Sequence, residues 1–370
     1  MVFTARLTVL GSLNIDISVT VPELPVPGAT VLGSAAVFAP GGKGANQAVA
    51  AARLARDAGM RVAMIGCTGD DDFGRALRTA LRAEGIDDSR VRTVVGAPTG
   101  IAMITVDHAG ENMITVAPGA NHEVSTADIA ATSSAGSSSP DPSRPDAAIT
   151  ALDPASTFRD VLVISAEVPV PVISAALAGS AGRMLRVLNL APAPSRAEAA
   201  ELVAAGPDWL VVNESEAAAV LGRRVAGLAE AADAAADLVA AGVLNAVVTA
   251  GAAGAAYCGP QAGKGDAAGN QAGNGDRRPA DAGQSAADAR PGVVTVPGFT
   301  VTAIDTVGAG DTFVGALAVA LAAGVPPVDA VTAAAAAGAA AAARPGTQPG
   351  MPRPADVGDV TGHRWPVTAR

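Results

Sequence analysis

The chain of 370 residues has few aromatic residues, cysteines and histidines. Aromatic residues make up 2% of the chain and hydrophobic residues 49%, so aliphatic side chains and alanine must build the core. The two cysteines, Cys67 and Cys258, lie far apart and have no metal-ligand spacing, which argues against a zinc site or a disulfide framework. The three histidines fall at no spacing typical of a catalytic triad or a metal site. The small number of cysteines favours a reducing compartment, and we therefore expect a cytoplasmic protein.

The chain also lacks a basic stripe and a long uninterrupted apolar run. Its net charge is −10, which argues against a nucleic-acid partner. The apolar stretch 312–343 is broken by Gly324, Pro326, Pro327 and Asp329 after roughly a dozen residues, too few to cross a bilayer. We therefore expect two buried helices there and no membrane partner. The first residues run directly into a strand pattern without a cleavage site, so we expect no signal peptide.

Apolar strand-like runs alternate with helical patterns along most of the sequence. The strands are expected at 7–10, 62–65, 161–164, 187–190, 210–212 and 246–249, and the helices at 45–58, 73–84, 171–181, 196–205, 214–221 and 228–241. This alternation predicts an α/β protein with a mostly parallel central sheet covered by helices on both faces. The main domain is expected to comprise residues 1–14, 40–98 and 118–355.

Several regions break this rhythm. Residues 15–39 and 99–117 read as short strands with turns, and we expect them to form a small β-sheet lid that excludes water from a ligand. The exposed face and edges of such a lid favour a homodimer. Residues 132–156 and 259–291 are too polar to bury a core, so we expect two disordered insertions. Residues 356–370 are expected to form a C-terminal tail.

The most informative segment is residues 305–313, which read Asp-Thr-Val-Gly-Ala-Gly-Asp-Thr-Phe before an alanine-rich helical pattern. Small residues at Gly308, Ala309 and Gly310 let the backbone approach a ligand, and a helix start adds free N–H donors. Together these features predict an anion hole. Asp311 lies within it and is the candidate base for phosphoryl transfer to a hydroxyl. On this segment alone, Asp311 could equally be only a helix cap.

Two further segments combine polar side chains with glycines. Asn14 and Asp16 lie two residues apart, so in an extended chain they point to one face and suit the hydroxyls of a sugar. Gly42 permits close approach of a ligand, Lys43 offers a charge for a phosphate or a hydroxyl, and Asn46 adds an amide on a first helical turn. The alternatives are a polar strand end at the solvent and a flexible loop with a surface lysine.

Other candidates follow predicted strands, where the ligands of open α/β sheets gather. Asn213 and Glu216 open a helix, and Glu216 could hold Mg²⁺ through water. The alternative for this pair is a capping box without a ligand. Weaker candidates at strand ends are Glu167, Asn189 and a small-residue turn at Thr249, Gly251 and Gly254, which could border a nucleotide.

Taken together, and in their order along the chain, the segments described above resemble those of the ribokinase family, the phosphofructokinase-B-type carbohydrate kinases. The resemblance spans residues 5–352 apart from the two insertions, and its two signatures lie at 41–47 and 305–313. It implies a ribokinase-like three-layer α/β/α sandwich with a small β-sheet lid. It also implies ATP-dependent phosphorylation of a sugar, D-ribose at O5, with Asp311 as the base. Alternatives are a kinase for another sugar or a nucleoside, and a non-catalytic sugar-binding regulator on the same fold.

The resemblance also implies roles for individual residues. Sugar binding falls to Asn14, Asp16, Gly42, Lys43, Asn46, Glu167 and Asp305. ATP binding falls to Asn213, Thr249, Gly251, Gly254 and Gly310. Mg²⁺ would be held through water by Glu216, and an activating K⁺ by Asp305, Val307, Ala341, Arg344, Gly346 and Gly350. The sequence departs from the family at Gly350, where a serine is usual, and near Ala334, where a histidine commonly approaches adenine.

Overall fold

The computed structural model describes residues 5–130, 160–260 and 292–367. The two segments expected to be disordered insertions lie outside the described residues, apart from the ends of the second at Gly259 and Pro260.

In the described part of the chain, nine strands form a large sheet in the order β13-β12-β11-β10-β9-β8-β1-β4-β5. Its strands are β1 (Arg6–Leu10), β4 (Arg61–Gly69), β5 (Asp87–Val94), β8 (Val161–Ser165), β9 (Leu185–Asn189), β10 (Trp209–Asn213), β11 (Asn245–Thr249), β12 (Gly254–Cys258) and β13 (Val293–Pro297). The strands from β11 to β5 pair in parallel, and β12 and β13 pair antiparallel at one edge. The central strands are mostly apolar, as expected for strands of a sheet whose two faces are both covered.

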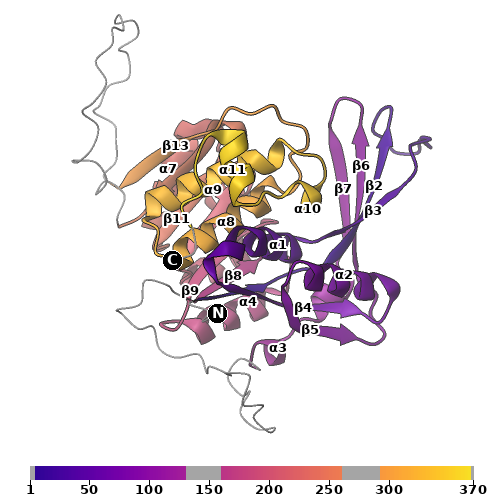
Figure 1. The fold of residues 1–370 in the computed structure, drawn as a ribbon, viewed down its shortest axis with the longest axis horizontal. Helices are drawn as coiled ribbons and strands as arrows, with labels where there is room; N and C mark the ends of the chain where they lie inside the picture. Colours follow the sequence, from indigo (N-terminus) through magenta and orange to yellow (C-terminus); the bar gives the residue numbers. More distant parts are fainter. Residues whose placement is uncertain (1–4, 131–159, 261–291, 368–370) are drawn as a thin grey trace, which may run out of the picture.

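Helices cover the two faces of this sheet over two separate apolar clusters (Figure 1). One face carries α1 (Lys43–Ala55), α2 (Asp72–Ala83), α8 (Ala309–Ala322), α9 (Pro327–Ala342) and α11 (Pro354–Thr361), with the short α10 (Thr347–Gly350) beside them. The other carries α3 (Thr126–Ala130), α4 (Val170–Ser180), α5 (Arg196–Ala204), α6 (Glu214–Leu221) and α7 (Gly227–Ala240). Alternation along β1 explains the division, since Val9 joins the first cluster and Leu10 the second. The predicted α/β/α sandwich is confirmed.

The stretch 312–343 forms the two buried helices α8 and α9, as its interrupted apolar pattern indicates. Alanine is the commonest residue in both helices, so their backbones pack closely against each other, and α8 also packs against α1. Across the ranges that the structure describes, no helix combines the length and the apolar character that a membrane span requires.

A second sheet projects from the body of the molecule (Figure 1), in the order β3-β2-β6-β7. Its strands are β2 (Asn14–Val21), β3 (Val37–Gly41), β6 (Gly100–Asp107) and β7 (Asn112–Ala117). β6 and β7 form the hairpin that the sequence predicts. All six residues of β7 are exposed, including Met113 and Ile114. Asn14 pairs with Gly41 and Gly100, so the base of this sheet adjoins the end of β1.

Two parts of the fold differ from the sequence-based prediction. Strands β5, β12 and β13 were not predicted, because their apolar residues are interrupted by charged, polar or small residues. Residues 356–367 are not a tail, since α11 extends to Thr361 and both Trp365 and Val367 are buried in the core. In a chain with so few aromatic residues, Trp365 supplies a large apolar surface, and its Nε1 donates to the Leu54 carbonyl at 3.2 Å.

Candidate active site

The site is built where the loop after β1 meets the first turn of α1. Gly42 caps α1 with a φ of 88°, a region that favours glycine. A Cβ at Gly42 would lie 2.7 Å from the Asn14 nitrogen and 2.9 Å from the Ser12 carbonyl oxygen. A Cβ at Gly44 would likewise lie 2.6 Å from the Gly11 backbone. The glycines therefore allow two backbones to pack closely enough to bring Asn14, Asp16 and Lys43 into one site.

Asp311 is buried in the first turn of α8, with an exposed fraction of 8%. Its Oδ2 accepts a hydrogen bond from Asn46 Nδ2 at 3.0 Å, and its Oδ1 accepts one from Gln47 Nε2 at 3.1 Å. The N-cap position of α8 belongs to Gly308, which makes no side-chain capping bond. The alternative reading of Asp311 as a mere helix cap is therefore wrong, since α1 holds its carboxylate in place.

Further amides extend this contact into a network. Gln348 Nε2 donates to Asn46 Oδ1 at 3.0 Å, and Gln47 Nε2 also donates to Asn189 Oδ1 at 2.9 Å. Asn189 in turn donates to the Val211 carbonyl at 3.2 Å. Gln47 and Gln348 were not predicted as site residues. The signal for Gln47 was a second amide beside Asn46 at the start of a helix whose other residues are mostly alanine.

The start of α8 leaves backbone donors open. Gly308 has a φ of 80°, and the Ala309 N–H donates to the Thr306 carbonyl at 3.2 Å. The N–H groups of Gly308, Gly310 and Asp311 have no acceptor among the residues that the structure describes. A Cβ at Gly310 would meet nothing within 4 Å, so there is open space beside these donors. The turn can therefore receive an anion, although the N–H of Ala309 is already engaged.

Most of the predicted sugar-binding residues lie around the end of β1. Ser12 Oγ donates to Glu167 Oε2, which also accepts the Lys43 N–H at 3.2 Å. A Cβ at Gly41 would lie 2.2 Å from Asp16 Oδ2, so glycine at this position leaves room for the Asp16 carboxylate. These contacts bring Asp16, Lys43 and Glu167 together, and they add Ser12, which was not predicted.

Asn121 anchors Asn14 and was also missed. Asn121 Nδ2 donates to Asn14 Oδ1 at 2.7 Å, and Asn121 Oδ1 accepts the Leu13 N–H at 2.9 Å. Asn14 is only 2% exposed. A side chain held in this way presents its remaining amide group with little loss of rotamer freedom, which favours ligand binding.

The charged groups of the site influence one another. Burial raises the pKa of Asp16 to about 7, the negative charges of Glu167 and Asp311 add to the effect, and Lys43 opposes it. Asp311 makes the largest contribution to raising the pKa of Lys43. Burial also raises the pKa of Glu216. A single lysine thus faces several carboxylates, and bound cations would offset their repulsion.

The raised pKa of Asp16 predicts a stability effect. An Asp16→Asn variant without ligand should melt at a higher temperature than the natural protein at about pH 8, by about 1–2 °C for each kcal/mol. The reason is that the folded protein resists ionisation of Asp16, so the natural chain loses stability as pH rises from 3.8 to about 7. Scanning calorimetry at about pH 8 and about pH 4 measures this, and the gain should vanish at the lower pH. An equal gain at both values would contradict the assignment.

Asn213 and Glu216 form a capping box at the start of α6. Glu216 Oε2 accepts the Asn213 N–H at 2.8 Å, and Asn213 Oδ1 accepts the Glu216 N–H at 2.8 Å. The capping box is therefore present, and it leaves lone pairs free on the Glu216 carboxylate. Lys43 and Asp311 lie near enough to affect the pKa of Glu216. Within the described residues, no three histidine, cysteine or acidic side chains converge to form a metal cage.

The predicted small-residue turn follows β11. A Cβ at Gly251 would meet nothing within 4 Å, so this position is open. Gly254 has a φ of 114°, and a Cβ there would lie 2.0 Å from the Val296 carbonyl oxygen. Packing against β13 therefore accounts for glycine at 254. Thr249 Oγ1 lies 3.4 Å from the Val212 carbonyl oxygen, at the end of the neighbouring strand.

Asp305 organises the loop before α8. Its Oδ1 accepts the Val307 N–H at 3.0 Å, and its Oδ2 accepts the Gly346 N–H at 3.0 Å. Asp305 thus joins the segment at Val307 to the segment at Gly346, about forty residues further along the chain. Val307 and Gly346 both belong to the set of residues predicted to lie near K⁺.

Carbonyl oxygens cluster beside Gly350. A Cβ at this glycine would lie 3.2 Å from the Arg344 oxygen, 3.4 Å from the Pro345 oxygen and 3.5 Å from the Ala341 oxygen. A set of carbonyl oxygens near a carboxylate suits a hard cation. The residues of this loop therefore fit the monovalent ion that the sequence predicts, and Pro345 is an addition to the predicted set.

A buried carboxylate beside open backbone donors, at the carboxyl end of a parallel sheet, is an arrangement for transferring a phosphoryl group to an alcohol. The profile of the pfkB family of carbohydrate kinases matches residues 4–272 and 280–354. The chain belongs to this family and is a sugar kinase.

Individual relatives agree with this assignment. A ribokinase of Schizosaccharomyces pombe is 32% identical over 357 residues, 95% of this chain and 96% of that protein. A ribokinase of Haemophilus influenzae is 32% identical over 316 residues, 85% of each chain. A deoxyribokinase of Salmonella typhi is 30% identical over 312 residues, 84% of each chain. The crystal structure of a ribokinase from Thermotoga maritima superposes with a TM-score of 0.70 at 26% identity, over 97% of this chain and 99% of that one.

Proposed function

We propose that the protein phosphorylates D-ribose at O5, with ATP as the donor, to give D-ribose 5-phosphate. The observation that carries this proposal is the carboxylate of Asp311, held by Asn46 and Gln47 at 3.0 and 3.1 Å beside the open N–H groups of α8. The similarity to ribokinases over most of the chain supports ribose as the sugar.

Asp311 accepts the proton of the sugar's primary hydroxyl as that oxygen attacks the γ-phosphate of ATP. The backbone N–H groups of Gly308, Gly310 and Asp311 stabilise the negative charge of the transferring group. The other sugar hydroxyls bond to the polar groups of Asn14, Asp16, Gly42, Lys43, Asn46, Glu167 and Asp305.

Two metal ions belong to this proposal. Glu216 would hold Mg²⁺ through water, because Mg²⁺ prefers oxygen ligands and keeps several waters. The ion neutralises charge on the phosphates when bound. Asp305 and the carbonyl oxygens beside Gly350 would hold K⁺ next to the anion hole. Val307, Ala341, Arg344 and Gly346 complete the proposed K⁺ set.

We assign the nucleotide to the carboxyl ends of β10 and β11. Asn213, Thr249, Gly251, Gly254 and Gly310 would border it. The open position at Gly251 leaves room for a ligand, whereas Gly254 would shape the turn through its packing against β13.

The small sheet would act as a lid that covers the sugar and excludes water from the phosphoryl group. Its exposed apolar residues, among them Met103, Met113 and Val116, favour a homodimer formed through this sheet. We place this dimer in the cytoplasm. Light scattering at micromolar concentration should give the mass of a dimer, and a monomer would contradict this part of the proposal.

Another substrate or another role would lead to different results. Because a deoxyribokinase is 30% identical to this chain, 2-deoxyribose is an alternative sugar substrate. A nucleoside kinase would need an aromatic or apolar clamp for the base, and only 2% of the residues are aromatic. A non-catalytic sugar-binding regulator would have no use for the anchored carboxylate of Asp311.

A substrate screen tests the proposed specificity. Ribose, 2-deoxyribose, fructose and adenosine should be compared with ATP and Mg²⁺, with and without K⁺, by the release of ADP. We expect the highest kcat/KM for ribose and a faster rate with K⁺. A preference for one of the other substrates would overturn the assignment of ribose, and sugar binding without ADP release would favour a regulator.

A further inference from the structure

A cavity of about 220 Å³ lies across the large sheet from Asp311. Leu10, Ile65 and Leu162 form part of its floor, on the face opposite α1 and α8. The end of α4 and the short α3 close its sides, with Ala176 from α4 and Ile129 from α3. No residue assigned to the kinase site lines it. The cavity is therefore separate from the catalytic centre and has its own apolar walls.

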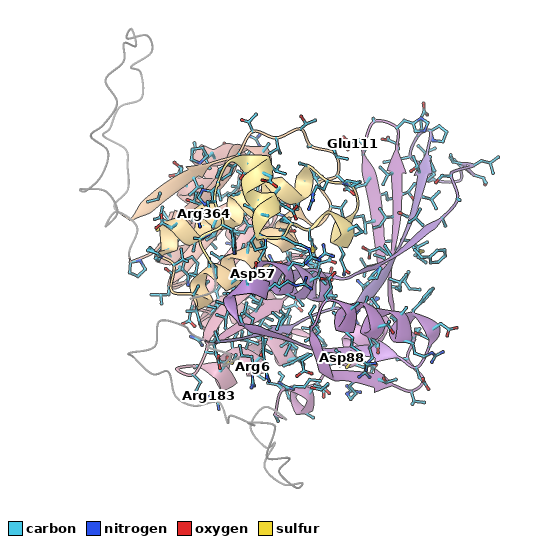
Figure 2. The ribbon with its side chains drawn as sticks, viewed as in Figure 1. Arg6, Asp57, Asp88, Glu111, Arg183 and Arg364 are labelled. Carbon is cyan, nitrogen blue, oxygen red and sulfur yellow. The ribbon has the colours of Figure 1, made fainter. Side chains whose placement is uncertain are left out.

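Three arginines border this cavity in a protein with a net charge of −10. Arg6 begins β1, Arg90 lies on β5, and Arg183 follows α4. Figure 2 shows Arg6 and Arg183 at the same edge of the molecule. Asp160 is the single carboxylate among the lining residues, and it accepts the Arg6 backbone N–H at 2.8 Å. The charge around the cavity is therefore positive.

Arg90 is half-buried, and its Nε has no hydrogen-bond partner within the described ranges. Its Nη2 donates to the backbone carbonyls of Asp128 and Ile129, at 2.5 and 3.4 Å. Neutral carbonyls do not compensate a buried guanidinium as a carboxylate does. Burial, followed by the positive charge of Arg6, lowers the pKa of Arg90, and the carboxylates of Asp128 and Asp87 oppose this shift only in part.

Several other half-buried arginines in the described part of the chain have an acidic partner. Arg53 pairs with Glu84 at 2.6 Å, and Arg186 pairs with Asp208 at 2.8 Å. On β5 itself, Arg92 pairs with Asp128 at 2.7 Å. Arg90, two residues away on the same strand, makes no such pair with any described residue. Arg90 thus lines the cavity without an acidic partner among the described residues.

We propose that this cavity binds a small organic anion, with its carboxylate at the guanidinium of Arg90 and its aliphatic part against the apolar floor. Arg6 and Arg183 add positive charge at the edge of the cavity. Guanidinium groups bind carboxylates in a planar, two-point geometry, and pockets for small ligands combine apolar walls with few polar anchors. The site would be independent of the sugar and ATP.

Methionine methyl NMR tests this site directly, because Met184 lines the cavity. The full chain, labelled with ¹³C at its methionine methyls, should be titrated with butyrate and with butyramide, its neutral analogue. Butyrate should shift the Met184 signal in a saturable way, and butyramide should bind at least about tenfold more weakly, the difference that about 1.4 kcal/mol produces. Met351, which is buried on the other side of the sheet, provides an internal reference.

Variants assign the effect to the arginines. Arg90→Met and Arg183→Met should each weaken butyrate binding, the first at least about tenfold. Arg82→Met is the matched control, since Arg82 pairs with Asp88 on the same strand and neither residue lines the cavity. If Arg90→Met does not fold, the Arg183→Met result decides. Equal binding of butyrate and butyramide, or loss of binding in Arg82→Met as large as in the other variants, would overturn the proposal.

Discussion

An Asp311→Ala variant should fold and bind sugar but lose about 10²–10⁴-fold or more in kcat. The substitution removes the proton acceptor and leaves the amides of Asn46 and Gln47 in place. Those amides lose an acceptor, which costs about 1–3 kcal/mol of stability, small enough for folding to persist. Steady-state kinetics with ribose and ATP, together with calorimetric sugar binding, measure both parts of the prediction.

Asp329→Ala provides the matched control for this variant. Asp329 also lies in the first turn of an alanine-rich helix, α9, but it is exposed and takes no part in the site. Its replacement should leave kcat unchanged. Near-native turnover in Asp311→Ala would remove Asp311 from the mechanism, and an equal loss in both variants would show that helix stability is responsible.

A Gly310→Val variant should lose about 10²–10³-fold in kcat while remaining at least as stable as the natural protein. The added side chain would enter the open space beside the free N–H groups of α8 and obstruct the phosphoryl group. The fold should tolerate it, because a Cβ at Gly310 meets nothing within 4 Å and glycine is unfavourable within a helix. Thermal melting and steady-state kinetics together test this separation of stability from activity.

Gly179→Val is the control for Gly310→Val. Gly179 is also an exposed helical glycine, in α4, and a Cβ there likewise meets nothing within 4 Å. It lies far from the proposed anion hole, so activity should persist. Full activity in Gly310→Val would show that the phosphoryl group does not occupy the space beside Gly310.

The sequence predicted the central part of the fold because its strands are buried on both faces. Continuous apolar runs such as 161–164 and 246–248 are typical of strands buried in a parallel sheet. Edge strands gave a weaker signal, since β5 carries several charged residues and β13 is partly exposed. The burial of Trp365 could not be read from its neighbours, which are polar or charged, because only tertiary packing brings it against α1.

The sequence predicted individual residues of the candidate site but not the hydrogen bonds that join them. Glycines at 308 and 310 and an aspartate at 311 carry a local signal, because helix starts and close backbone approaches have local rules. The bond between Asn46 and Asp311 joins residues 265 positions apart, and the bond from Gln348 to Asn46 spans 302 positions. No periodicity in the sequence predicts a hydrogen bond between residues so far apart in the chain. Only the packing of α1 against α8 and α10 reveals that Gln47 and Gln348 belong to the network.

The position of the transferred phosphoryl group tests the central claim most directly. ATP, ribose labelled with ¹³C at C5, Mg²⁺ and K⁺ should be incubated with the protein and followed by ³¹P and ¹³C NMR. The account predicts a phosphate ester coupled to C5 and one ADP for each ester formed. Release of inorganic phosphate without a sugar ester, or an ester on another carbon, would contradict it.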